Sequence, residues 1–371
     1  MGEKAKLRVT VLFGGQSGEH EISIRSARSV VDAIDRHRFE PTLVGIDRQG
    51  GWHFHGTESF RRLTTDAAEG SLGNIALVSR YGAHCLIETE QGGRTVAELD
   101  VIFPVLHGPF GEDGRIQGLL EMFGIPYVGA GVLGSAVGMD KDVQKRLLRD
   151  AGIAIVPFLT VRRAEWERAG RSIRERVSEL GMPIFVKPAN LGSSVGISKV
   201  HDDSELAPAV AEAFGYDDKI VIEKGIDARE IECSVLGNDE PAVSVLGEIV
   251  PAADFYSYEA KYSAGSQAKL LIPAPLDEDL AKTMRASALR VFRVLECSGM
   301  ARVDYLLERT TSTPYVNELN TMPGFTSISM YPKLWEATGL GFSELVTRLI
   351  DLAMERDRAA RSRASKTKTR R

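Results

Sequence analysis

The sequence predicts a mixed protein in which an α/β part with a parallel sheet precedes an α+β part with antiparallel strands. The first third alternates short β-branched runs with helical patterns, and such alternation is typical of a parallel sheet with helices on both faces. From residue 153 the pattern changes, and from residue 230 longer strands surround one helical pattern, which favours antiparallel pairing. A length of 371 residues leaves room for two or three domains.

Hydrophobic periodicity gives the elements of the first third in order. A β-branched run predicts a strand over 7–13, and apolar residues at helical spacing predict a helix over 19–35. A second strand is expected over 41–46. A third strand, over 100–106, precedes a helix over 116–122.

The later elements are predicted in the same way. Strand-like segments are expected over 153–161, 184–187, 196–200 and 220–223. Longer strands around a helix over 280–296 are expected at 230–236, 242–250, 301–307 and 315–319. The last residues, 357–371, are rich in Arg, Lys, Ser and Ala without an apolar stripe, so a disordered tail is predicted there, with a basic interaction arm as the alternative.

Composition points to a small-molecule partner. The hydrophobic share of 43% and the charged share of 26% are ordinary, and a net charge of −5 gives no overall attraction to nucleic acid or an anionic membrane. No stretch reaches the roughly 20 apolar residues of a membrane span, and the apolar run over 9–13 is too short for a signal peptide. Cys85, Cys233 and Cys297 lie far apart without CxxC spacing. A cytoplasmic protein without nucleic-acid or membrane partners is therefore expected.

Two glycine motifs match known signatures but lack the required context. Residues 129–134 fit G-x-G-x-x-G, yet the dinucleotide fingerprint needs a strand ending in an acidic residue about 20 positions later, and Asp150 precedes the next strand instead. We interpret this motif as a glycine-rich turn between domains. Residues 192–196 fit the G-x-S-x-G elbow of serine hydrolases, which requires a following helix. A strand is predicted there, so a nucleophilic Ser194 is not expected.

The loop over 192–196 suits phosphate binding better. A glycine and serine loop between two strands can fold over phosphates and offer backbone N–H groups and hydroxyls. The sequence has no Walker A motif, so an ATP site would need this different cradle. Lys141 and Lys187 would supply positive charge. A lone lysine is usually a solvated surface charge, so each is weak evidence by itself, but beside a metal pair the two indicate a nucleotide-phosphate site.

The strongest chemical signal lies on two predicted strands near the C-terminus. Residues i and i+2 of a strand share a face, so Arg302 points the same way as Asp304, and Glu318 the same way as Asn320. If the hairpin loop is centred on Thr311, Asp304 lies opposite Glu318. Opposed carboxylates repel, and two carboxylates with an amide oxygen form the hard site that Mg²⁺ prefers. The alternative is a solvated surface on which Arg302 neutralises both acids.

These features together resemble the D-alanine:D-alanine ligase family of ATP-grasp enzymes, over about residues 9–349. Their order and spacing make the resemblance specific. The motifs that carry it are Phe13-Gly-Gly-Gln-Ser-Gly-Glu-His-Glu-Ile-Ser23, His107-Gly-Pro-Phe-Gly-Glu-Asp-Gly114, Met139-Asp-Lys141, Lys187-Pro-Ala-Asn-Leu-Gly-Ser-Ser-Val-Gly196, Glu259-Ala-Lys-Tyr262, Arg302-Val-Asp304 and Glu318-Leu-Asn-Thr-Met-Pro-Gly324.

The resemblance implies an ATP-grasp fold with an N-terminal Rossmann-like domain of parallel strands. It places a substrate domain over 1–138, a central subdomain with the glycine-rich loop over 139–229 and a C-terminal subdomain with the metal site over 230–356. The implied reaction joins two D-alanine molecules for peptidoglycan precursor synthesis. The first carboxylate attacks the γ-phosphate of ATP, and the second amine then displaces phosphate from the acyl phosphate. A homodimer is also implied.

The resemblance assigns roles around the first D-alanine. Glu19 would pair with its ammonium group, although a glutamate that merely complements its helix dipole is an alternative. His107 would line the same pocket unless it is a plain surface histidine. Tyr262 would be hydrogen-bonded across to Ser193 and Glu19.

The predicted loop over 321–330 would serve the second step. Gly324 is free to adopt unusual dihedral angles there, and the exposed hydroxyl and N–H groups suit an anion. By resemblance, Arg302 and the Gly324 amide would stabilise the oxyanion of the tetrahedral intermediate. Ser329 and the Met330 amide would take the carboxylate of the second D-alanine.

The resemblance also gives a nucleotide and metal site. Lys141 and Lys187 would hold the α- and β-phosphates, with Ser193 closing over them. Two Mg²⁺ ions, replaceable by Mn²⁺, would be bound by Asp304, Glu318 and Asn320. The adenine and ribose would face Glu223, Lys224, Ile226 and Glu230, although both glutamates would otherwise be routine strand-end charges.

The long polar loop over 251–268 would act as a lid that excludes water. Lys261 would reach the γ-phosphate. The Lys261-Tyr262 pair is kept here, whereas relatives that make D-alanyl-D-lactate depart from it. Two alternatives stay open: the same chemistry with D-serine or D-lactate as acceptor, and a nucleotide-binding regulator without turnover. Such a regulator would have no need for Lys261, Arg302 and Glu19.

Overall fold

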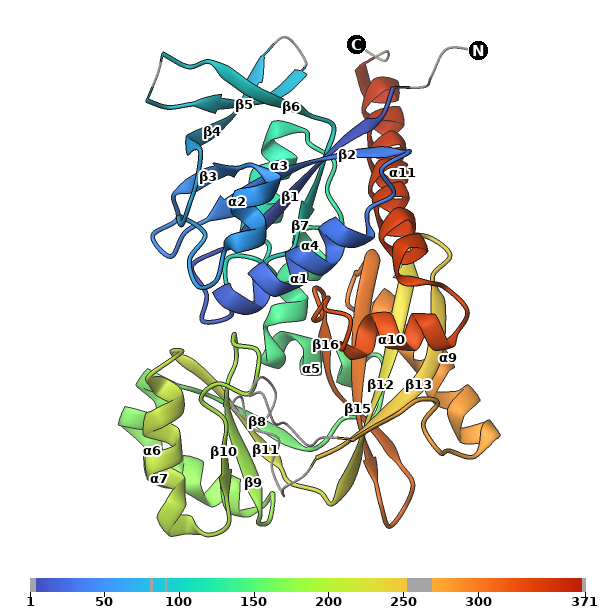
Figure 1. Ribbon diagram of the computed structural model, residues 1–371. Helices are drawn as coiled ribbons and strands as arrows, with labels where there is room; N and C mark the ends of the chain where they lie inside the picture. Colours follow the sequence, from blue (N-terminus) through green and yellow to red (C-terminus); the bar gives the residue numbers. More distant parts are fainter. Residues whose placement is uncertain (1–4, 81–82, 91, 252–268, 369–371) are drawn as a thin grey trace.

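The computed structural model describes residues 5–80, 83–90, 92–251 and 269–368, and the strands of these residues form three sheets (Figure 1). A seven-stranded sheet lies in the N-terminal part, a four-stranded sheet in the middle and a five-stranded sheet in the C-terminal part. In Figure 1 the central unit lies below the N-terminal sheet and beside the C-terminal sheet. The predicted mixture of α/β and α+β structure is therefore confirmed.

The N-terminal sheet has the order β6-β5-β4-β3-β2-β1-β7. Its strands are β1 (Leu7–Gly14), β2 (Phe39–Ile46), β3 (Trp52–His55), β4 (Gly73–Arg80), β5 (Ala83–Glu88), β6 (Thr95–Leu99) and β7 (Val101–Pro104). Strands β2, β1 and β7 pair in parallel, whereas the pairs from β2 to β6 are antiparallel. The three strands that sequence analysis predicted here, β1, β2 and β7, are thus parallel as expected, whereas β3 to β6 were not predicted. The short turn over 47–51 makes β2 and β3 antiparallel, because a parallel pair needs a crossover of a dozen or more residues.

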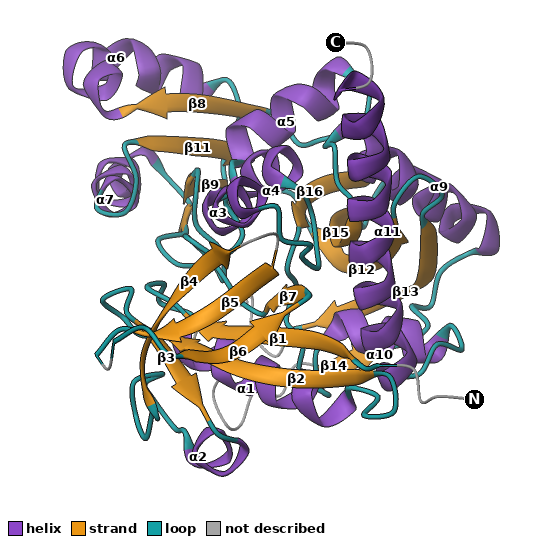
Figure 2. Ribbon diagram, turned by 90° about the horizontal axis from the view of Figure 1, so that it is seen from above, coloured by secondary structure: helices purple, strands orange, loops and turns teal. Residues whose placement is uncertain are grey.

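Helices cover both faces of this sheet, as predicted. Helices α1 (His20–Ala33) and α2 (Thr57–Arg62) lie on one face and α3 (Arg115–Phe123) on the other, as Figure 2 shows. Val11 and Phe13 of β1 pack with Ile24 of α1, whereas the intervening Leu12 packs with Leu120 of α3. This alternation follows from the two-residue period of a strand. Helix α4 (Val132–Met139) follows the glycine-rich turn.

The central sheet is antiparallel, in the order β10-β9-β11-β8. The elements of this unit are α5 (Lys141–Asp150), β8 (Phe158–Arg162), α6 (Arg163–Ser178), β9 (Ile184–Pro188), β10 (Ser198–Val200), α7 (Asp203–Phe214) and β11 (Lys219–Lys224). The loop over 189–197 joins two paired strands. It is therefore not the strand-to-helix elbow of a serine hydrolase, which confirms the prediction for Ser194.

The C-terminal sheet has the order β14-β13-β12-β15-β16. Its strands are β12 (Ala228–Gly237), β13 (Ala242–Val250), β14 (Lys269–Leu271), β15 (Gly299–Glu308) and β16 (Pro314–Asn320), with α9 (Glu278–Val294) on one face. Asp304 pairs with Glu318 and Arg302 with Asn320, so the predicted register is confirmed. A bulge at Asn317 follows, because the next pair joins Tyr305 to Val316.

Helix α11 (Phe342–Lys368) ties the C-terminal unit to the N-terminal sheet. Arg356 donates to the carbonyl oxygens of Gly129 at 2.5 Å and Tyr127 at 2.8 Å, and to Ser298 Oγ at 2.8 Å. The prediction of a disordered tail is wrong for 357–368, where the helix continues. The packed first half of the helix and these Arg356 contacts fix its direction, and the following Ala, Arg and Lys residues are good helix formers.

Candidate active site

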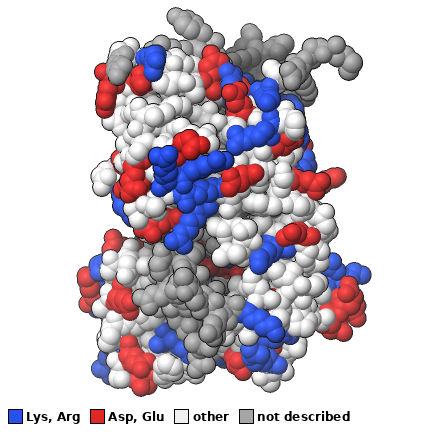
Figure 3. Space-filling view, viewed as in Figure 1, with Lys and Arg blue, Asp and Glu red and all other residues white. Residues whose placement is uncertain are grey.

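A cleft of about 1660 Å³ opens where the three units meet. Its walls come from α1, the loop after β7, the loop over 189–197, strands β11, β12, β15 and β16, and the loop before α10 (Met330–Ala337). On the face shown in Figure 3, Lys and Arg gather over the part of the N-terminal unit that carries α1 in Figure 1. Arg25 and Arg28 of α1 also line the cleft. This positive rim favours anionic ligands.

A row of three carboxylates crosses the sheet that forms the floor of the cleft. Glu232 of β12 pairs with Asp304 of β15, which in turn pairs with Glu318 of β16. The neighbouring Val303 points the other way, into the core beneath α9. Carboxylates in register on one face repel one another, so this row requires compensating positive charge.

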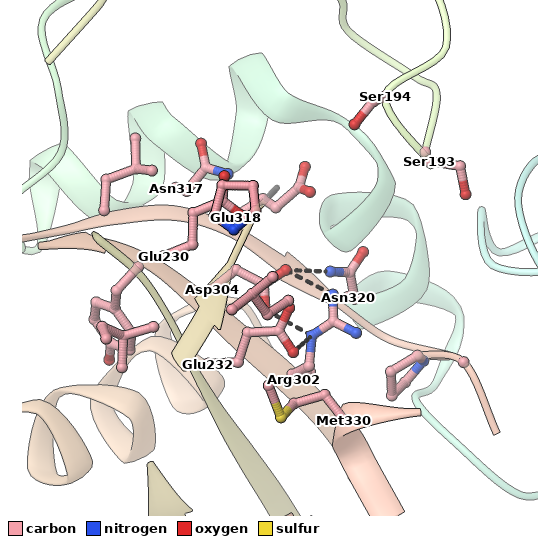
Figure 4. A pocket seen from close by; sticks show the side chains of 18 of the residues that line it. Ser193, Ser194, Glu230, Glu232, Arg302, Asp304, Asn317, Glu318, Asn320 and Met330 are labelled. Carbon is pink, nitrogen blue, oxygen red and sulfur yellow. Dashed lines mark hydrogen bonds and ion pairs between the residues drawn. The ribbon is translucent and has the colours of Figure 1, made fainter. Parts of the chain in front are cut away.

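Arg302 and Lys141 supply that charge. Arg302 donates to the two oxygens of Asp304 at 2.7 and 2.8 Å and forms an ion pair with Glu232 at 2.9 Å (Figure 4). Lys141 Nζ lies 3.3 Å from Glu318 Oε2. Burial opposes the charge of Arg302, but attraction by Asp304 and Glu232 outweighs burial and raises its pKa. Arg302 is therefore a fixed cation in the cleft.

The donors around Asp304 fit a hard divalent cation. Asp304, Glu318 and Asn320 all offer oxygen atoms as ligands. Because Asn320 Nδ2 donates to Asp304 at 2.8 Å, the amide oxygen of Asn320 is the atom that can bind a cation. Within the described ranges, no group of three or more His, Cys, Asp or Glu side chains is disposed to hold a metal by itself. A cation here would need further oxygens from a ligand, as Mg²⁺ obtains from nucleotide phosphates.

Glu223 joins two lysines beside the cleft. Its Oε2 accepts from Lys187 Nζ at 2.8 Å, and its Oε1 lies 3.1 Å from Lys145 Nζ. Burial opposes the charge of Glu223, but attraction by both lysines lowers its pKa. For Lys187, burial is outweighed by the attraction of Glu223 and the pKa is raised. For Lys145, burial dominates and the pKa is lowered. Lys187 is thus held as a charged group that faces the cleft.

The serine loop is strained and held on two sides. Ser193 and Ser194 have φ angles of 52° and 61°, in the left-handed region that non-glycine residues rarely adopt. Such strain concentrates at functional sites. Ser193 Oγ donates to Glu19, and Lys141 Nζ donates to the carbonyl oxygen of Leu191 at 2.5 Å. The loop therefore connects the N-terminal ends of α1 and α5.

The loop before α10 contains the remaining predicted residues. Ser329 occupies the N-cap position of α10, and its Oγ accepts from the Thr326 N–H at 3.1 Å. A Cβ on Gly324 would lie 2.9 Å from Ser329 Oγ, so a side chain there would displace the Ser329 hydroxyl. The φ angle of Gly324 is not positive, so close packing rather than an unusual dihedral angle explains this glycine. The N-terminus of α10, where Met330 begins the helix, favours an anion.

His107 is 4% exposed, which excludes the alternative of a plain surface histidine. Its Nδ1–H donates to the Met322 carbonyl oxygen at 3.0 Å, and its Nε2 accepts from the Ser26 hydroxyl at 2.9 Å. Burial lowers the pKa of His107, so the ring is neutral in this network. The nearby charge of Glu19 acts in the opposite direction on this pKa but does not outweigh burial.

All predicted site residues that the structure describes line this one cleft. They are Glu19, His107, Lys141, Lys187, Ser193, Glu223, Lys224, Ile226, Glu230, Arg302, Asp304, Glu318, Asn320, Gly324, Ser329 and Met330. Lys261 and Tyr262 lie outside the described residues, as does the predicted lid apart from Pro251.

Sequence analysis missed four residues of this site. Glu232 shares a strand face with Glu230, so the two-residue period would have found it. Glu112 lies in the same motif as His107. The sequence did not indicate Lys145 or Asn317. Lys145 matters because it is buried, and Asn317 because it lies in a bulge, and neither property can be predicted from a periodic pattern.

The fold and the cleft together define an ATP-grasp enzyme. A four-stranded antiparallel sheet carries the glycine and serine loop, a five-stranded sheet carries the carboxylate row, and both face one cleft that an α/β unit completes. Lys141 joins this loop to Glu318 of the carboxylate row, and Lys187 is held beside the cleft by Glu223.

Comparisons with known proteins identify the family. The family models described as D-ala D-ala ligase N-terminus and C-terminus match residues 8–130 and 147–351. The chain is 50% identical to D-alanine–D-alanine ligase A of Escherichia coli K12 over 358 residues, which is 95% of this chain and 97% of that protein.

Two solved structures are also similar over nearly the whole chain. The D-alanine-D-alanine ligase from Coxiella burnetii has a TM-score of 0.85 with 36% identity and covers 99% of each chain. The VanG D-Ala:D-Ser ligase from Enterococcus faecalis has a TM-score of 0.82 with 35% identity and covers 94% of this chain and 100% of that one. The chain belongs to the D-alanine–D-alanine ligase family.

Proposed function

We propose that this protein joins two D-alanine molecules into D-alanyl-D-alanine, with conversion of ATP to ADP and phosphate, and so supplies a peptidoglycan precursor. The observation that carries this proposal is the convergence of every described candidate residue on one cleft. Its relatives bear the same activity in their names. The cleft has cations and carboxylates at one place and an ammonium partner, Glu19, beside the serine loop.

ATP would bind against the central sheet. Lys141 and Lys187 would hold the α- and β-phosphates, and the raised pKa of Lys187 keeps its charge at neutral pH. Ser193 and its neighbouring amides would close over the phosphates. The adenine and ribose would face the cleft-lining residues Glu223, Lys224, Ile226 and Glu230. Since both oxygens of Glu223 already face lysines, we assign it mainly to holding Lys187 in place.

We propose that Asp304, Glu318 and Asn320 hold two Mg²⁺ ions, for which Mn²⁺ can substitute. When bound, these ions neutralise charge on the phosphates and on the attacking and leaving oxygens. Arg302 and Lys141, which neutralise the same carboxylates here, would then be available to the substrates. Chelation of the divalent ion should therefore abolish phosphate release, which can be restored by adding Mg²⁺ or Mn²⁺.

The ligation would proceed in two steps. In the first, Glu19 pairs with the ammonium of one D-alanine beside His107, and the substrate carboxylate attacks the γ-phosphorus as ADP leaves. In the second, the amine of another D-alanine attacks the acyl phosphate and phosphate leaves. Arg302 and the Gly324 amide would stabilise the tetrahedral oxyanion.

Ser329, at the N-terminus of α10, would hold the carboxylate of the second D-alanine together with the Met330 amide. The loop over 251–268, with Lys261 at the γ-phosphate and Tyr262 near Ser193, would exclude water from the acyl phosphate.

A second candidate is the same chemistry with D-serine as acceptor. It is favoured by the similarity of the VanG D-Ala:D-Ser ligase over 94% of this chain. The deciding experiment measures phosphate release from ATP with D-alanine alone and with D-alanine plus D-serine, D-lactate or L-alanine, and identifies each product by mass spectrometry. D-alanyl-D-alanine as the main product supports the proposal. A mixed dipeptide or depsipeptide supports the alternative acceptors, and no phosphate release would indicate a regulator without turnover.

The proposal also covers the cellular location, the oligomeric state and the domain boundaries. Among the helices in the described part of the chain, none is long and apolar enough to cross a membrane. We propose a cytoplasmic location, a homodimer by family likeness, and domains over 1–138, 139–229 and 230–356. Light scattering on the purified protein tests the dimer, because a monomer mass at working concentration contradicts it.

A further inference from the structure

The backbone of Met322 is clamped by the loop that follows β7. The Met322 N–H donates to Glu112 Oε2 at 3.2 Å, and the Met322 carbonyl oxygen accepts from His107 at 3.0 Å. Both polar groups of one residue in the C-terminal unit are thus held by two side chains of the N-terminal unit, more than 200 positions earlier in the chain.

The clamping loop is itself rigid. Glu112 Oε1 accepts from the Gly108 N–H at 2.6 Å, and the Glu112 N–H donates to the Gly108 carbonyl oxygen at 3.0 Å. Gly108 has a φ angle of 74°, which glycine adopts without strain. The Ser17 hydroxyl donates to the His107 carbonyl oxygen at 2.6 Å. Glu112 therefore reaches Met322 from a fixed position.

The clamp determines which backbone N–H group is left for a ligand. In the described stretch from Met322 to Thr326, the N–H groups of Met322, Phe325 and Thr326 each donate to a side chain, and Pro323 has none. Among these residues, the Gly324 N–H is the one without a hydrogen bond to the described protein. The acceptor for Phe325 is Ser26, which is also bonded to His107. Both sides of Gly324 are thus fixed by one network.

We propose that Glu112 is a positioning residue, whose carboxylate fixes the Met322 backbone so that the Gly324 N–H is aimed at the developing oxyanion. This inference rests on the proposed function and assigns it a residue that sequence analysis did not single out. A donor to an oxyanion must be held in place before the reaction, and misplacement by about 1 Å can lower the rate on the order of 100-fold.

Glu112 also shares its surroundings with the first-substrate site. The pKa of Glu112 is raised to about 8 by burial and by the charge of Glu19, while Arg302 acts in the opposite direction. An ammonium group bound at Glu19 would offset this repulsion and favour the ionised clamp. Binding of the first D-alanine would then support the geometry needed in the second step.

The test replaces Glu112 by Gln, which keeps the volume but offers one acceptor oxygen instead of two. Asp113→Asn is the matched control, because Asp113 accepts from Phe110 and Arg115 within the same loop and has no bond to Met322. We expect E112Q to lower kcat on the order of 10- to 100-fold, with the KM for ATP within about twofold of wild type. D113N should leave kcat within about threefold.

Hydrogen–deuterium exchange provides a readout that does not depend on turnover. In E112Q, the amides over 321–325 should exchange about tenfold faster or more, because the hydrogen bond from the Met322 N–H to Glu112 is lost, while the central sheet stays unchanged. Unchanged exchange over 321–325 overturns the clamp whatever the activity, and faster exchange with wild-type kcat overturns the positioning role. If the wild-type protein releases no phosphate with D-alanine, the proposed function fails, whereas the exchange result still decides whether Glu112 holds Met322.

Discussion

Replacement of Glu223 by Gln is predicted to lower the free energy of unfolding by about 3 kcal/mol. Removal of one partner from a buried ion pair typically costs about 3–5 kcal/mol. The side chains of Glu223 and Lys145 are 2% and 1% exposed, so Gln would leave two enclosed ammonium groups without their nearest counter-charge. We expect the lower end of the range, because burial already lowers the pKa of Lys145 and its deprotonation would limit the loss.

Lys145→Met gives the contrasting result. It removes the Lys145 ammonium group, for which the cost of burial exceeds the attraction of Glu223. The Glu223–Lys187 pair at 2.8 Å stays intact. Because Glu223 keeps Lys187 as its charged partner and burial already disfavours the charge of Lys145, the free energy of unfolding should stay within about 1 kcal/mol of wild type. The double variant E223Q/K145M should recover part of the loss.

Urea unfolding of the four proteins, followed by circular dichroism without nucleotide, measures these differences. The reasoning is refuted if E223Q loses less than about 1 kcal/mol, or if K145M loses as much as E223Q. Either result would mean that the three charges do not form one compensated group.

Three further predictions concern other parts of the molecule. Arg302→Lys keeps the charge beside Asp304 but loses the planar two-point contact, so kcat should fall on the order of 10- to 100-fold while nucleotide affinity by calorimetry changes little; equal losses in both would contradict an oxyanion role. Asp304→Asn should raise the Mg²⁺ concentration for half-maximal phosphate release on the order of tenfold, and an unchanged requirement would remove Asp304 from the metal site. The hydrogen bond from Arg8 lowers the pKa of Asp100 below its ordinary value of 3.8, so this carboxylate stabilises the fold above that pH and the contribution is lost as the pH falls through the folded-state pKa. The difference in urea midpoint between wild type and D100N should accordingly shrink from about pH 5 to about pH 2, and a constant difference would be evidence against the pairing.

The hairpin of β15 and β16 was predictable from sequence. The two-residue period and a loop centred on Thr311 were enough to place Asp304 opposite Glu318, and the structure confirms that pair. The same reasoning failed nearer the turn, because the bulge at Asn317 shifts the later pairs by one residue. A bulge depends on packing around it, which no periodic pattern records.

Two larger features were not predictable for similar reasons. Strands β3 to β6 were not predicted. Short connections join β2 to β3 and β4 to β5 and make these pairs antiparallel, and a sequence interpreted as β-α-β alternation overlooks such connections. Helix α11 continues past residue 357 because Arg356 is anchored to residues that are distant in the chain, Tyr127, Gly129 and Ser298. The Glu112 clamp on Met322 is also a contact between distant segments, and composition gives no sign of it.

The central claim is that the acidic row on the C-terminal sheet binds metal-nucleotide beneath the serine loop. A crystal structure of the protein with Mg²⁺ and a non-hydrolysable ATP analogue tests it most directly. We predict a cation within about 2.0–2.2 Å of oxygens from Asp304 and Glu318, with phosphate oxygens completing its shell and Lys187 at the phosphates. A nucleotide bound elsewhere, or carboxylates that keep their contacts to Arg302 and Lys141 with no ion between them, would contradict the account.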